Sequence, residues 1–477
     1  MNRSVAAAGD YHLQIISFFE TECYLAGVAD VLGVMHFGFE SRCFDGRFSL
    51  VPALERGPVA SGWIHDAGYA RHGGSEAGLH ISLRPDGYGH RQVRIDKEER
   101  LLAQAGADAM TEWSEFDIRC MRLALEQAEK GCGMVSPNPP VGCVLASGDQ
   151  IVAAGWHDHL GGLHAEQSAI ADAEERGLAT HGSVAYITLE PCNHHGRTPP
   201  CTEALLWAGV QEVVLAAADP NPTVRGGGAE FLREAGIIVR SGLLEDEARR
   251  QMAPFMHWCE HRRPLVTLKA AIDADGVVDN ENEEAGRFTS EASLTRVHEL
   301  RRESDAVLVG VNTVIRDDPE LTVRLVPLGA GRQPLRIILD HTLRTPTTSR
   351  MVTDGEATLI LHSDGDERRA SALASDSVEV LRLSPLQPTE PPGVELDQLL
   401  DLLGDRGLQR VLIEGGPDVW NRFLRAGLVD EAFIIRTNSS IGPGPAAGID
   451  ATVLSTAGLQ CTSNDSSMDD VIEHWLG

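Results

Sequence analysis

The hydrophobic positions of the chain after residue 115 alternate between helical and strand-like spacing. Ile118, Met121 and Leu125 recur every three or four residues, which predicts an amphipathic helix from Asp117 that Gly131 ends. Short apolar runs and further helical patterns follow in turn. The pattern predicts strands at 142–145, 151–156, 183–188, 212–216 and 237–240, and helices over 164–176, 201–209 and 229–235. Strands that alternate with helices favour an α/β layer fold.

The same alternation starts again after a helical stretch at 244–259, which we expect to connect to a second domain. The second half has predicted strands at 265–271, 306–311, 335–339, 358–362, 378–381, 411–414 and 432–435, and helices over 290–303 and 418–427. The Pro-rich stretch 382–393 is predicted to be a surface loop, and 471–476 is a candidate docking segment at the C-terminus.

The first 112 residues differ from the rest. They hold 11 of the 24 aromatic residues, which is enough apolar material for a small folded unit, but they contain no motif of known chemistry. We therefore predict three parts: an N-terminal extension of unknown fold and function at 1–112, an α/β domain at 113–260 and a second α/β domain at 261–477.

Charge and composition limit the partners of the protein. The 477 residues include 41 basic and 70 acidic side chains, a net charge of −29, which opposes binding to nucleic acid or to anionic membranes but allows a local cationic pocket. No apolar run approaches the roughly 18 residues of a membrane helix, and Asp10 interrupts the N-terminus before a signal peptide could form. Nine cysteines without a disulfide-like pattern indicate a reducing compartment, and we predict a cytoplasmic location.

The most specific chemical pattern is a set of three metal-ligand residues beside one carboxylate. His164-Ala-Glu166 opens a predicted helix, Pro191-Cys192 follows 26 residues after the Glu, and Cys201 opens another helix nine positions later. One imidazole and two thiolates leave the fourth tetrahedral position of a zinc ion open for water, which is typical of a catalytic site. Glu166 is placed to shuttle protons without binding the metal, as in zinc nucleobase deaminases.

Three other interpretations compete with this one. A His-Ala-Glu triplet can arise by chance, with the cysteines a structural pair. A nucleic-acid-editing deaminase would share the zinc site, but it needs a basic groove with stacking aromatics, which the net charge and the few aromatics after residue 112 oppose. A non-enzymatic protein with structural zinc and a regulatory nucleotide-binding domain would leave Glu166 without a purpose.

Longer motifs around these residues carry a resemblance to a known family. The sequences 136–143 (SPNPPVGC), 188–201 (TLEPCNHHGRTPPC) and 219–222 (DPNP) closely resemble the bifunctional pyrimidine deaminase/reductases of riboflavin biosynthesis. The resemblance implies a zinc cytidine-deaminase-like three-layer domain, with His164, Cys192 and Cys201 as metal ligands and Glu166 as the catalytic residue. It also implies that Asn138, His157, His194 and Arg197 bind a phosphorylated pyrimidine.

In this family the second domain resembles dihydrofolate reductase and uses NADPH. The matching stretches are 305–313 (DAVLVGVNT), 317–324 (DDPELTVR) and 414–417 (EGGP), together with Lys269 and Arg301. The resemblance implies that Thr313, Asp317 and Gly416 bind the cofactor and that Arg301, Leu321, Arg324 and Glu414 bind the substrate. The implied function is hydrolytic deamination of 2,5-diamino-6-(5-phosphoribosylamino)pyrimidin-4(3H)-one, followed by NADPH-dependent reduction of the ribosyl group. It further implies a homo-oligomer formed through the reductase-like domain.

The second domain also departs from the family pattern. Asp273, Val277, Ala285 and Arg287 stand where the family typically has Ser, a basic residue, Ser and Trp. The acidic stretch 279–284 would repel phosphates unless Arg287 compensates. Two states therefore stay open: an active reductase with altered contacts, or a deaminase with a catalytically degenerate second domain, acting in a specialised pathway.

Overall fold

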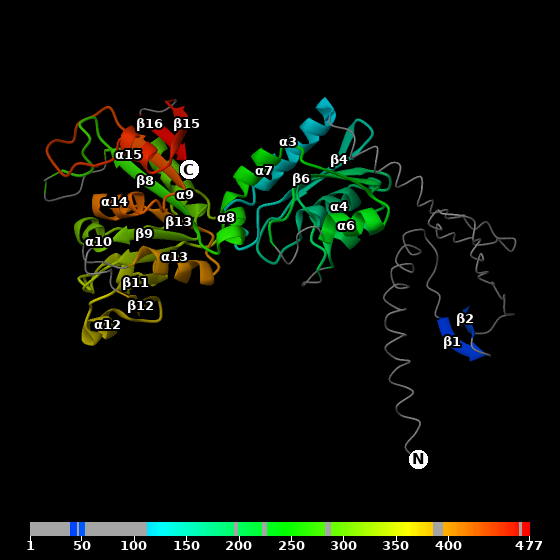
Figure 1. Cartoon of the computed structure of the whole chain (residues 1–477), viewed down its shortest axis with the longest axis horizontal. Coiled ribbons are helices and arrows are strands. Elements are labelled where there is room, and N and C mark those ends of the chain that lie inside the picture. The colour runs from blue at the N-terminus through cyan, green and yellow to red at the C-terminus, as the bar shows by residue number, and fades with distance from the viewer. Residues whose placement is uncertain are drawn as a thin grey trace, which may run out of the picture.

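Two sheets with helices on both faces make up most of the described chain. The computed structural model describes residues 39–44, 47–52, 112–194, 199–221, 227–280, 282, 288–384, 395–466 and 470–477. Within the expected extension, β1 (Phe39–Phe44) and β2 (Arg47–Pro52) pair antiparallel as a separate sheet, and the rest of 1–111 lies outside the described residues. The two larger sheets lie side by side along the long axis of the molecule, and helix α8 (Ala253–His261) lies between them (Figure 1).

The first large sheet has five strands in the order β4-β3-β5-β6-β7. β3 pairs antiparallel with β4 and β5, while β5, β6 and β7 are parallel. The strands are β3 (Gly142–Ser147), β4 (Gln150–Trp156), β5 (Val184–Leu189), β6 (Glu212–Ala217) and β7 (Ile238–Ser241), and the helices are α3 (Glu115–Glu129), α4 (Ala165–Glu175), α5 (Cys201–Trp207), α6 (Gly227–Glu234), α7 (Glu245–Gln251) and α8 (Ala253–His261).

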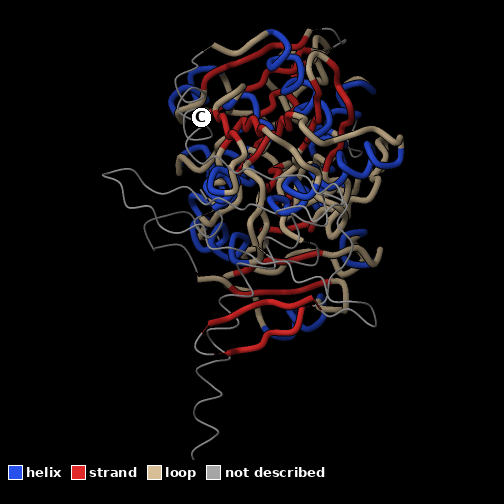
Figure 2. Tube along the Cα trace, turned by 90° about the vertical axis from the view of Figure 1, so that its right-hand side faces the viewer, coloured by secondary structure: helices blue, strands red, loops and turns tan. Residues whose placement is uncertain are grey.

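Helices cover both faces of this sheet because its strands are apolar on both sides. Val144 and Val214 face a core shared with α3, α7 and α8, whereas their neighbours Cys143 and Val213 face a core shared with α4, α5 and α6. This arrangement confirms the predicted three-layer domain, and Figure 2 distinguishes the helices and strands of the described chain by colour. A Cβ at Gly142 would lie 1.9 Å from the carbonyl oxygen of Ala124, so α3 can pack this closely only against a glycine.

The second large sheet has nine strands in the order β12-β11-β10-β9-β13-β8-β14-β16-β15. All neighbours from β12 to β14 are parallel, and the C-terminal β16 and β15 add antiparallel at one edge. The strands are β8 (Leu265–Ile272), β9 (Ala306–Gly310), β10 (Leu335–Leu339), β11 (Thr358–His362), β12 (Val378–Arg382), β13 (Arg410–Ile413), β14 (Glu431–Arg436), β15 (Gln460–Asp465) and β16 (Val471–Leu476). The predicted docking of 471–476 is confirmed, because this segment is β16.

Seven helices in the described part of the second domain divide between the two faces of its sheet. They are α9 (Glu291–Arg302), α10 (Val311–Asp317), α11 (Arg350–Thr353), α12 (Glu367–Leu373), α13 (Leu396–Asp405), α14 (Pro417–Arg425) and α15 (Ala451–Thr456). Side chains of α13, α14 and α15 belong to one core cluster, and side chains of α9 to α12 belong to the other. The domain is therefore also three-layered.

The connection between the domains and the end of β9 differ from the sequence prediction. The expected single helix 244–259 is broken at Met252 (φ −99°, ψ 16°) into α7 and α8, because Pro254 in the first turn of α8 has no N–H to continue a helix from α7. The expected strand 306–311 ends at Gly310, and Val311 already begins α10.

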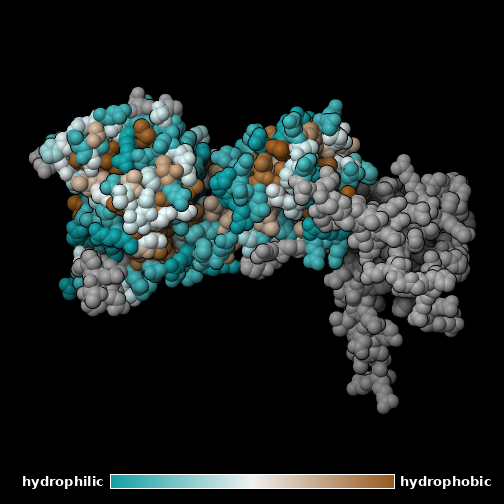
Figure 3. Space-filling model, turned by 45° about the horizontal axis from the view of Figure 1, so that its top comes forward, coloured by the Kyte–Doolittle hydropathy of each residue, from teal (hydrophilic) through white to brown (hydrophobic). Residues whose placement is uncertain are grey.

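The surface of the described chain is mixed in character. On the face shown in Figure 3, hydrophobic residues are interspersed with hydrophilic ones over both domains. None of the helices in the described ranges has the length and apolar character needed to cross a membrane.

Candidate active sites

Three ligand atoms of the predicted metal site come together at the ends of three elements. His164 is the N-cap of α4, Cys201 is the first residue of α5, and Cys192 lies in the loop after β5. The Nδ1 atom of His164 is 3.6 Å from Sγ of Cys192 and 3.3 Å from Sγ of Cys201, and all three ligand atoms lie within 4.8 Å of one another. One imidazole and two thiols in a half-buried cluster fit zinc, which prefers nitrogen and sulfur donors.

The charge state of the two thiols supports the same assignment. The Cys201 thiol donates a hydrogen bond to Cys192 and lowers the pKa of Cys192 to about 4. Burial acts to raise this pKa, and a hydrogen bond from His164 also lowers it. The hydrogen bond between the two thiols, together with burial, raises the pKa of Cys201 well above its usual value. A divalent ion would allow both thiols to ionise, as ligation requires.

Glu166 lies beside this cluster and is not one of the ligand residues. It is the second residue of α4 and is 3% exposed. Burial, followed by the negative charge of Cys192, raises the pKa of its carboxyl group to about 7. A carboxyl group with a pKa near neutrality can both accept and return a proton.

Asn138 and His157 are brought together next to the ligands. The ring of His157 is 3% exposed, and its centroid is 5.2 Å from that of His164. Its Nδ1 is 2.9 Å from the carbonyl oxygen of Leu163, which can only accept, so Nδ1 carries the hydrogen. Burial lowers the pKa of His157 and keeps the ring neutral, so Nε2 accepts a hydrogen bond from the amide of Asn138 at 3.0 Å.

The other two predicted substrate residues of this site are less constrained. His194 is exposed, two positions after Cys192, and acts to lower the pKa of Asp219, although burial raises that pKa overall to about 6. Arg197 lies outside the described residues.

A residue without a role in the sequence analysis holds the Cys192 loop in place. One carboxylate oxygen of Glu190 accepts the backbone N–H groups of Gly228 and Ala229, and the other accepts that of Asp219. Glu190 is 4% exposed, and a buried carboxylate needs hydrogen-bond partners. An acidic residue at the end of an apolar strand is therefore the sequence signal that could have identified it.

In the second domain, neighbouring parallel strands send their helices to opposite faces of the sheet. β9 is followed by α10 and β13 by α14, and these helices belong to different core clusters. Such a switch point leaves a crevice at the carboxyl ends of the strands, where nucleotides bind in α/β folds. Thr313 of α10 and Gly416, the N-cap of α14, meet there, because a Cβ on Gly416 would lie 3.9 Å from Oγ1 of Thr313. Asp317 ends α10.

Two predicted substrate residues of the second domain bind each other. Glu414 follows β13 and accepts two bonds from Arg301 of α9, Nε to Oε1 at 2.5 Å and Nη2 to Oε2 at 2.9 Å. Lys269 Nζ is 3.9 Å from Oε2 of Glu414, and burial lowers the pKa of this lysine. Burial opposes ionisation of Glu414, but the positive charge of Arg301 holds the pKa of Glu414 below its usual value. Arg301 and Lys269 thus both approach the carboxylate of Glu414.

Leu321 and Arg324 lie on a segment with unusual backbone geometry. Asp318 and Leu321 have φ angles of 39° and 54°, a region that residues other than glycine rarely adopt and that is often found at functional sites. Leu321 is 4% exposed and packs in the core, whereas Arg324 is on the surface and forms an ion pair with Glu320.

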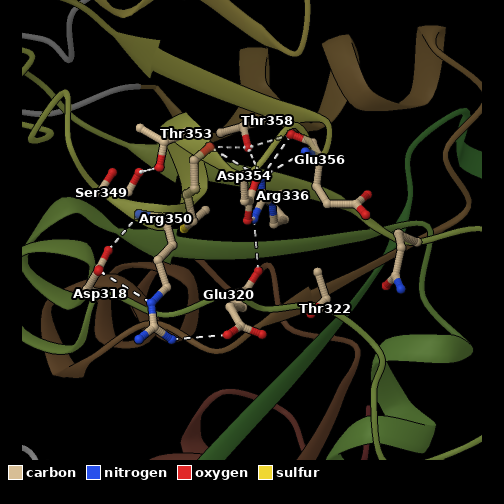
Figure 4. Close-up of polar contacts among 12 residues, drawn as sticks. Asp318, Glu320, Thr322, Arg336, Ser349, Arg350, Thr353, Asp354, Glu356 and Thr358 are labelled. Atoms are coloured by element: carbon tan, nitrogen blue, oxygen red, sulfur yellow. Dashed lines mark hydrogen bonds and ion pairs between the residues drawn. The ribbon is translucent and has the colours of Figure 1, made fainter.

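The buried Arg336 holds this segment through a hydrogen bond to its backbone. Arg336 of β10 is 1% exposed and donates to the carbonyl oxygen of Glu320 at 3.1 Å, while both its Nη atoms bind Asp354 (Figure 4). Arg350 binds the carboxylate of Glu320 at 3.0 Å from the surface side. The segment is therefore held at Glu320 by two arginines of different burial.

The departures from the family pattern have structural explanations where they are described. Asp273 is 4% exposed and accepts backbone N–H groups of Asp275, Val277 and Ile441, so it organises the turn after β8. Arg316 pairs with Asp279 at 2.8 Å, so part of the acidic stretch is neutralised by Arg316. Ala285 and Arg287 lie outside the described residues.

Family comparisons match each domain separately. A family model described as the cytidine and deoxycytidylate deaminase zinc-binding region matches residues 114–217, and one described as the RibD C-terminal domain matches residues 264–460.

Among curated proteins, the riboflavin biosynthesis protein RibD of Aquifex aeolicus is 40% identical over 334 residues, 70% of this chain and 90% of that protein. RibD of Escherichia coli is 36% identical over 324 residues, 66% of this chain and 85% of that protein.

Solved structures agree with the sequence matches. Acinetobacter baumannii RibD aligns with a TM-score of 0.65 and 33% identity, covering 76% of this chain and 99% of that chain. A Thermotoga maritima structure titled as a diaminohydroxyphosphoribosylaminopyrimidine deaminase/5-amino-6-(5-phosphoribosylamino)uracil reductase aligns with a TM-score of 0.66 and 32% identity, covering 76% and 98%.

Proposed function

The chain belongs to the RibD family of riboflavin biosynthesis proteins, and on this premise we propose how its residues divide two successive reactions between the two domains. Membership confirms the deaminase and reductase activities and the Zn²⁺ and NADPH cofactors expected from the sequence. The deaminase-only alternative is not favoured. The gathering of His164, Cys192 and Cys201 beside the buried Glu166 is the observation that carries the first reaction.

The first reaction is the hydrolytic deamination of 2,5-diamino-6-(5-phosphoribosylamino)pyrimidin-4(3H)-one. His164, Cys192 and Cys201 hold Zn²⁺, which makes water more acidic when bound. Glu166 carries two protons in turn: the first from the attacking water to the ring nitrogen, and the second from the newly attached hydroxyl group to the departing amine, which leaves as ammonia. Asn138 and the neutral His157 orient the pyrimidine, and His194 and Arg197 bind on its phosphate side. The net reaction consumes water, replaces the 2-amino group by a carbonyl oxygen and releases ammonia.

The second reaction reduces the ribosyl group of 5-amino-6-(5-phosphoribosylamino)uracil. NADPH, when bound, supplies a hydride. Thr313, Asp317 and Gly416 bind the nucleotide at the switch point of the sheet. Arg301 and Glu414 bind each other and act together on the substrate. Leu321 packs beneath the substrate segment, residues 317–324. Arg324 leaves its ion pair with Glu320 and binds the substrate phosphate instead.

We also propose that the chain works in the cytoplasm on small phosphorylated pyrimidines, without nucleic-acid or membrane partners, as a homo-oligomer formed through the reductase-like domain. All seven cysteines after residue 112 are free thiols, which agrees with a reducing compartment. Light scattering of the intact chain against chains cut between the domains tests the oligomer.

The decisive experiment is mass spectrometry of the products formed from the diaminopyrimidine, with and without NADPH. We expect a gain of about 1 Da without NADPH and a further gain of about 2 Da with it. A Glu166→Gln variant should lose the first product by at least 10²-fold, because general acid–base catalysis contributes roughly 10²–10⁴-fold. Full ammonia release from that variant, or zinc near zero per chain by elemental analysis, would refute the first assignment. An unchanged NADPH absorbance with the deaminated product would refute the second.

A further inference from the structure

The loop that carries Asn138 is held by side chains of the other domain. The loop lies between α3 and β3, and the two residues before Asn138 each bind the second domain. Ser136 Oγ donates to a carboxylate oxygen of Asp305, and Gln409 Nε2 donates to the carbonyl oxygen of Pro137 at 2.6 Å. The residue that contacts His157 is therefore preceded by two anchors that the deaminase domain does not supply.

The backbones of the two domains also meet at the start of this loop. A Cβ on Gly133 (φ +75°) would lie 2.3 Å from the carbonyl oxygen of Arg302, and a Cβ on Gly331 would lie 2.7 Å from the carbonyl oxygen of Gly133. Contact this close has no room for side chains. The loop is therefore fixed at both Gly133 and Pro137.

Asp305 is itself rigidly held. Its side chain is 7% exposed, and its second carboxylate oxygen accepts the backbone N–H groups of Gln409 at 2.7 Å and Arg410 at 3.1 Å. The carboxylate thus joins the start of β9 to the start of β13 and uses its remaining oxygen for Ser136. An anchor with this little freedom can position a loop accurately.

We propose that Asp305 and Gln409 are positioning residues for deamination: they hold Ser136 and Pro137 so that the amide of Asn138 points at His157 and at the pyrimidine. The inference rests on the substrate role of Asn138 proposed above. It makes the deaminase site incomplete without the second domain.

The test uses the full chain with three variants. Gln409→Met removes the donor to Pro137 at nearly constant size, and Ser136→Ala removes the hydroxyl that binds Asp305 while leaving Asp305 bonded to β13. Trp258→Phe is the matched control, because Nε1 of Trp258 donates to the carbonyl oxygen of Gly404 and joins the same two domains away from the loop. Ammonia release gives KM and kcat for deamination, NADPH oxidation with the aminouracil reports the reductase, and thermal melting reports folding.

We expect Gln409→Met and Ser136→Ala to raise KM for the diaminopyrimidine by roughly 10-fold with smaller changes in kcat, since a misplaced binding group loses orientation. Reductase turnover should stay unchanged, and Trp258→Phe should leave KM unchanged. Adding either substitution to Asn138→Ala should raise KM no further, because both act through Asn138; a purely structural role would not give this non-additivity.

Different outcomes separate the two claims. If Asn138→Ala leaves KM unchanged, the substrate role of Asn138 fails and the inference fails with it. If Asn138→Ala raises KM while Gln409→Met and Ser136→Ala do not, only the positioning role is overturned. An equal rise in KM for Trp258→Phe also overturns it, because general domain docking would then explain the effect.

Discussion

Replacing Arg336 by methionine tests how the reductase-like domain supports its substrate segment. The guanidinium donates six hydrogen bonds: two to Asp354, one to Oγ1 of Thr358, and three to the carbonyl oxygens of Glu320, Met351 and Glu356 (Figure 4). Arg336→Met fills a similar volume but removes every one of them. The segment 317–324 then loses its link to β10.

The expected loss of stability follows from burial. Removing one partner of a buried ion pair costs about 3–5 kcal/mol. Since the Asp354 side chain is 27% exposed and water can reach it, the lower value of about 3 kcal/mol applies. For a domain of about 200 residues, each kcal/mol lowers Tm by about 2–4 °C, so we expect a fall of about 6–12 °C.

Arg350→Met is the control for this experiment. Arg350 binds the same Glu320, but its side chain is 59% exposed. Pairs this exposed contribute about 0–1 kcal/mol, which corresponds to a fall in Tm of at most about 4 °C.

Calorimetry of the full chain measures both variants, with the reductase transition identified by its upward shift when NADPH is added. At a temperature where both variants are folded, Arg336→Met should lose reductase activity and retain deaminase activity. Equal Tm values for the two variants would refute the reasoning, because burial would then have no effect on the contribution of the arginine.

Two further predictions concern metal and pH. Removing zinc with a chelator should abolish ammonia release, leave NADPH oxidation with the aminouracil intact, and be reversed by added Zn²⁺; loss of both activities would show that the two sites are not independent. Glu431 is 9% exposed in its side chain, and although burial opposes ionisation, Arg410 and His474 lower its pKa from 4.5 to about 2. A depressed pKa stabilises the fold above pH 4.5 and loses this contribution as pH falls toward 2. Urea unfolding should therefore show Glu431→Gln about 3 kcal/mol less stable at pH 7, with a difference that shrinks below about pH 4; a constant difference would contradict the assignment.

The sequence predicted the deaminase domain more completely than the reductase-like domain. Its strands are short apolar runs between clear helices, and two of the three expected zinc ligands, His164 and Cys201, stand at helix starts, where pattern and chemistry coincide. In the second domain α10, α11 and α12 have at most seven residues, too few for two turns of helical periodicity. α13 did carry the signal, with leucines at 396, 399, 400 and 403, but was missed.

Long-range pairing explains what sequence reasoning could not reach. All six residues of β15 are exposed, so this strand exists through its backbone bonds to β16 and has no apolar pattern. Arg301 and Glu414 were both selected as substrate residues, but their mutual bond joins positions 113 residues apart. The number of residues between two positions in the sequence does not show whether their side chains are in contact.

The close approach at Gly133 has a consequence for inheritance. Gly133 has no side chain and so lies close to the backbone carbonyl of Arg302, while Ser136 and Pro137 are hydrogen-bonded to Asp305 and Gln409. Residues encoded in one half of the gene therefore depend on residues encoded in the other half. Recombination in the 260–264 connection between related genes would separate these matched pairs while leaving each half intact. Fusion of the two enzymes in one reading frame keeps the matched pairs together in every copy of the gene.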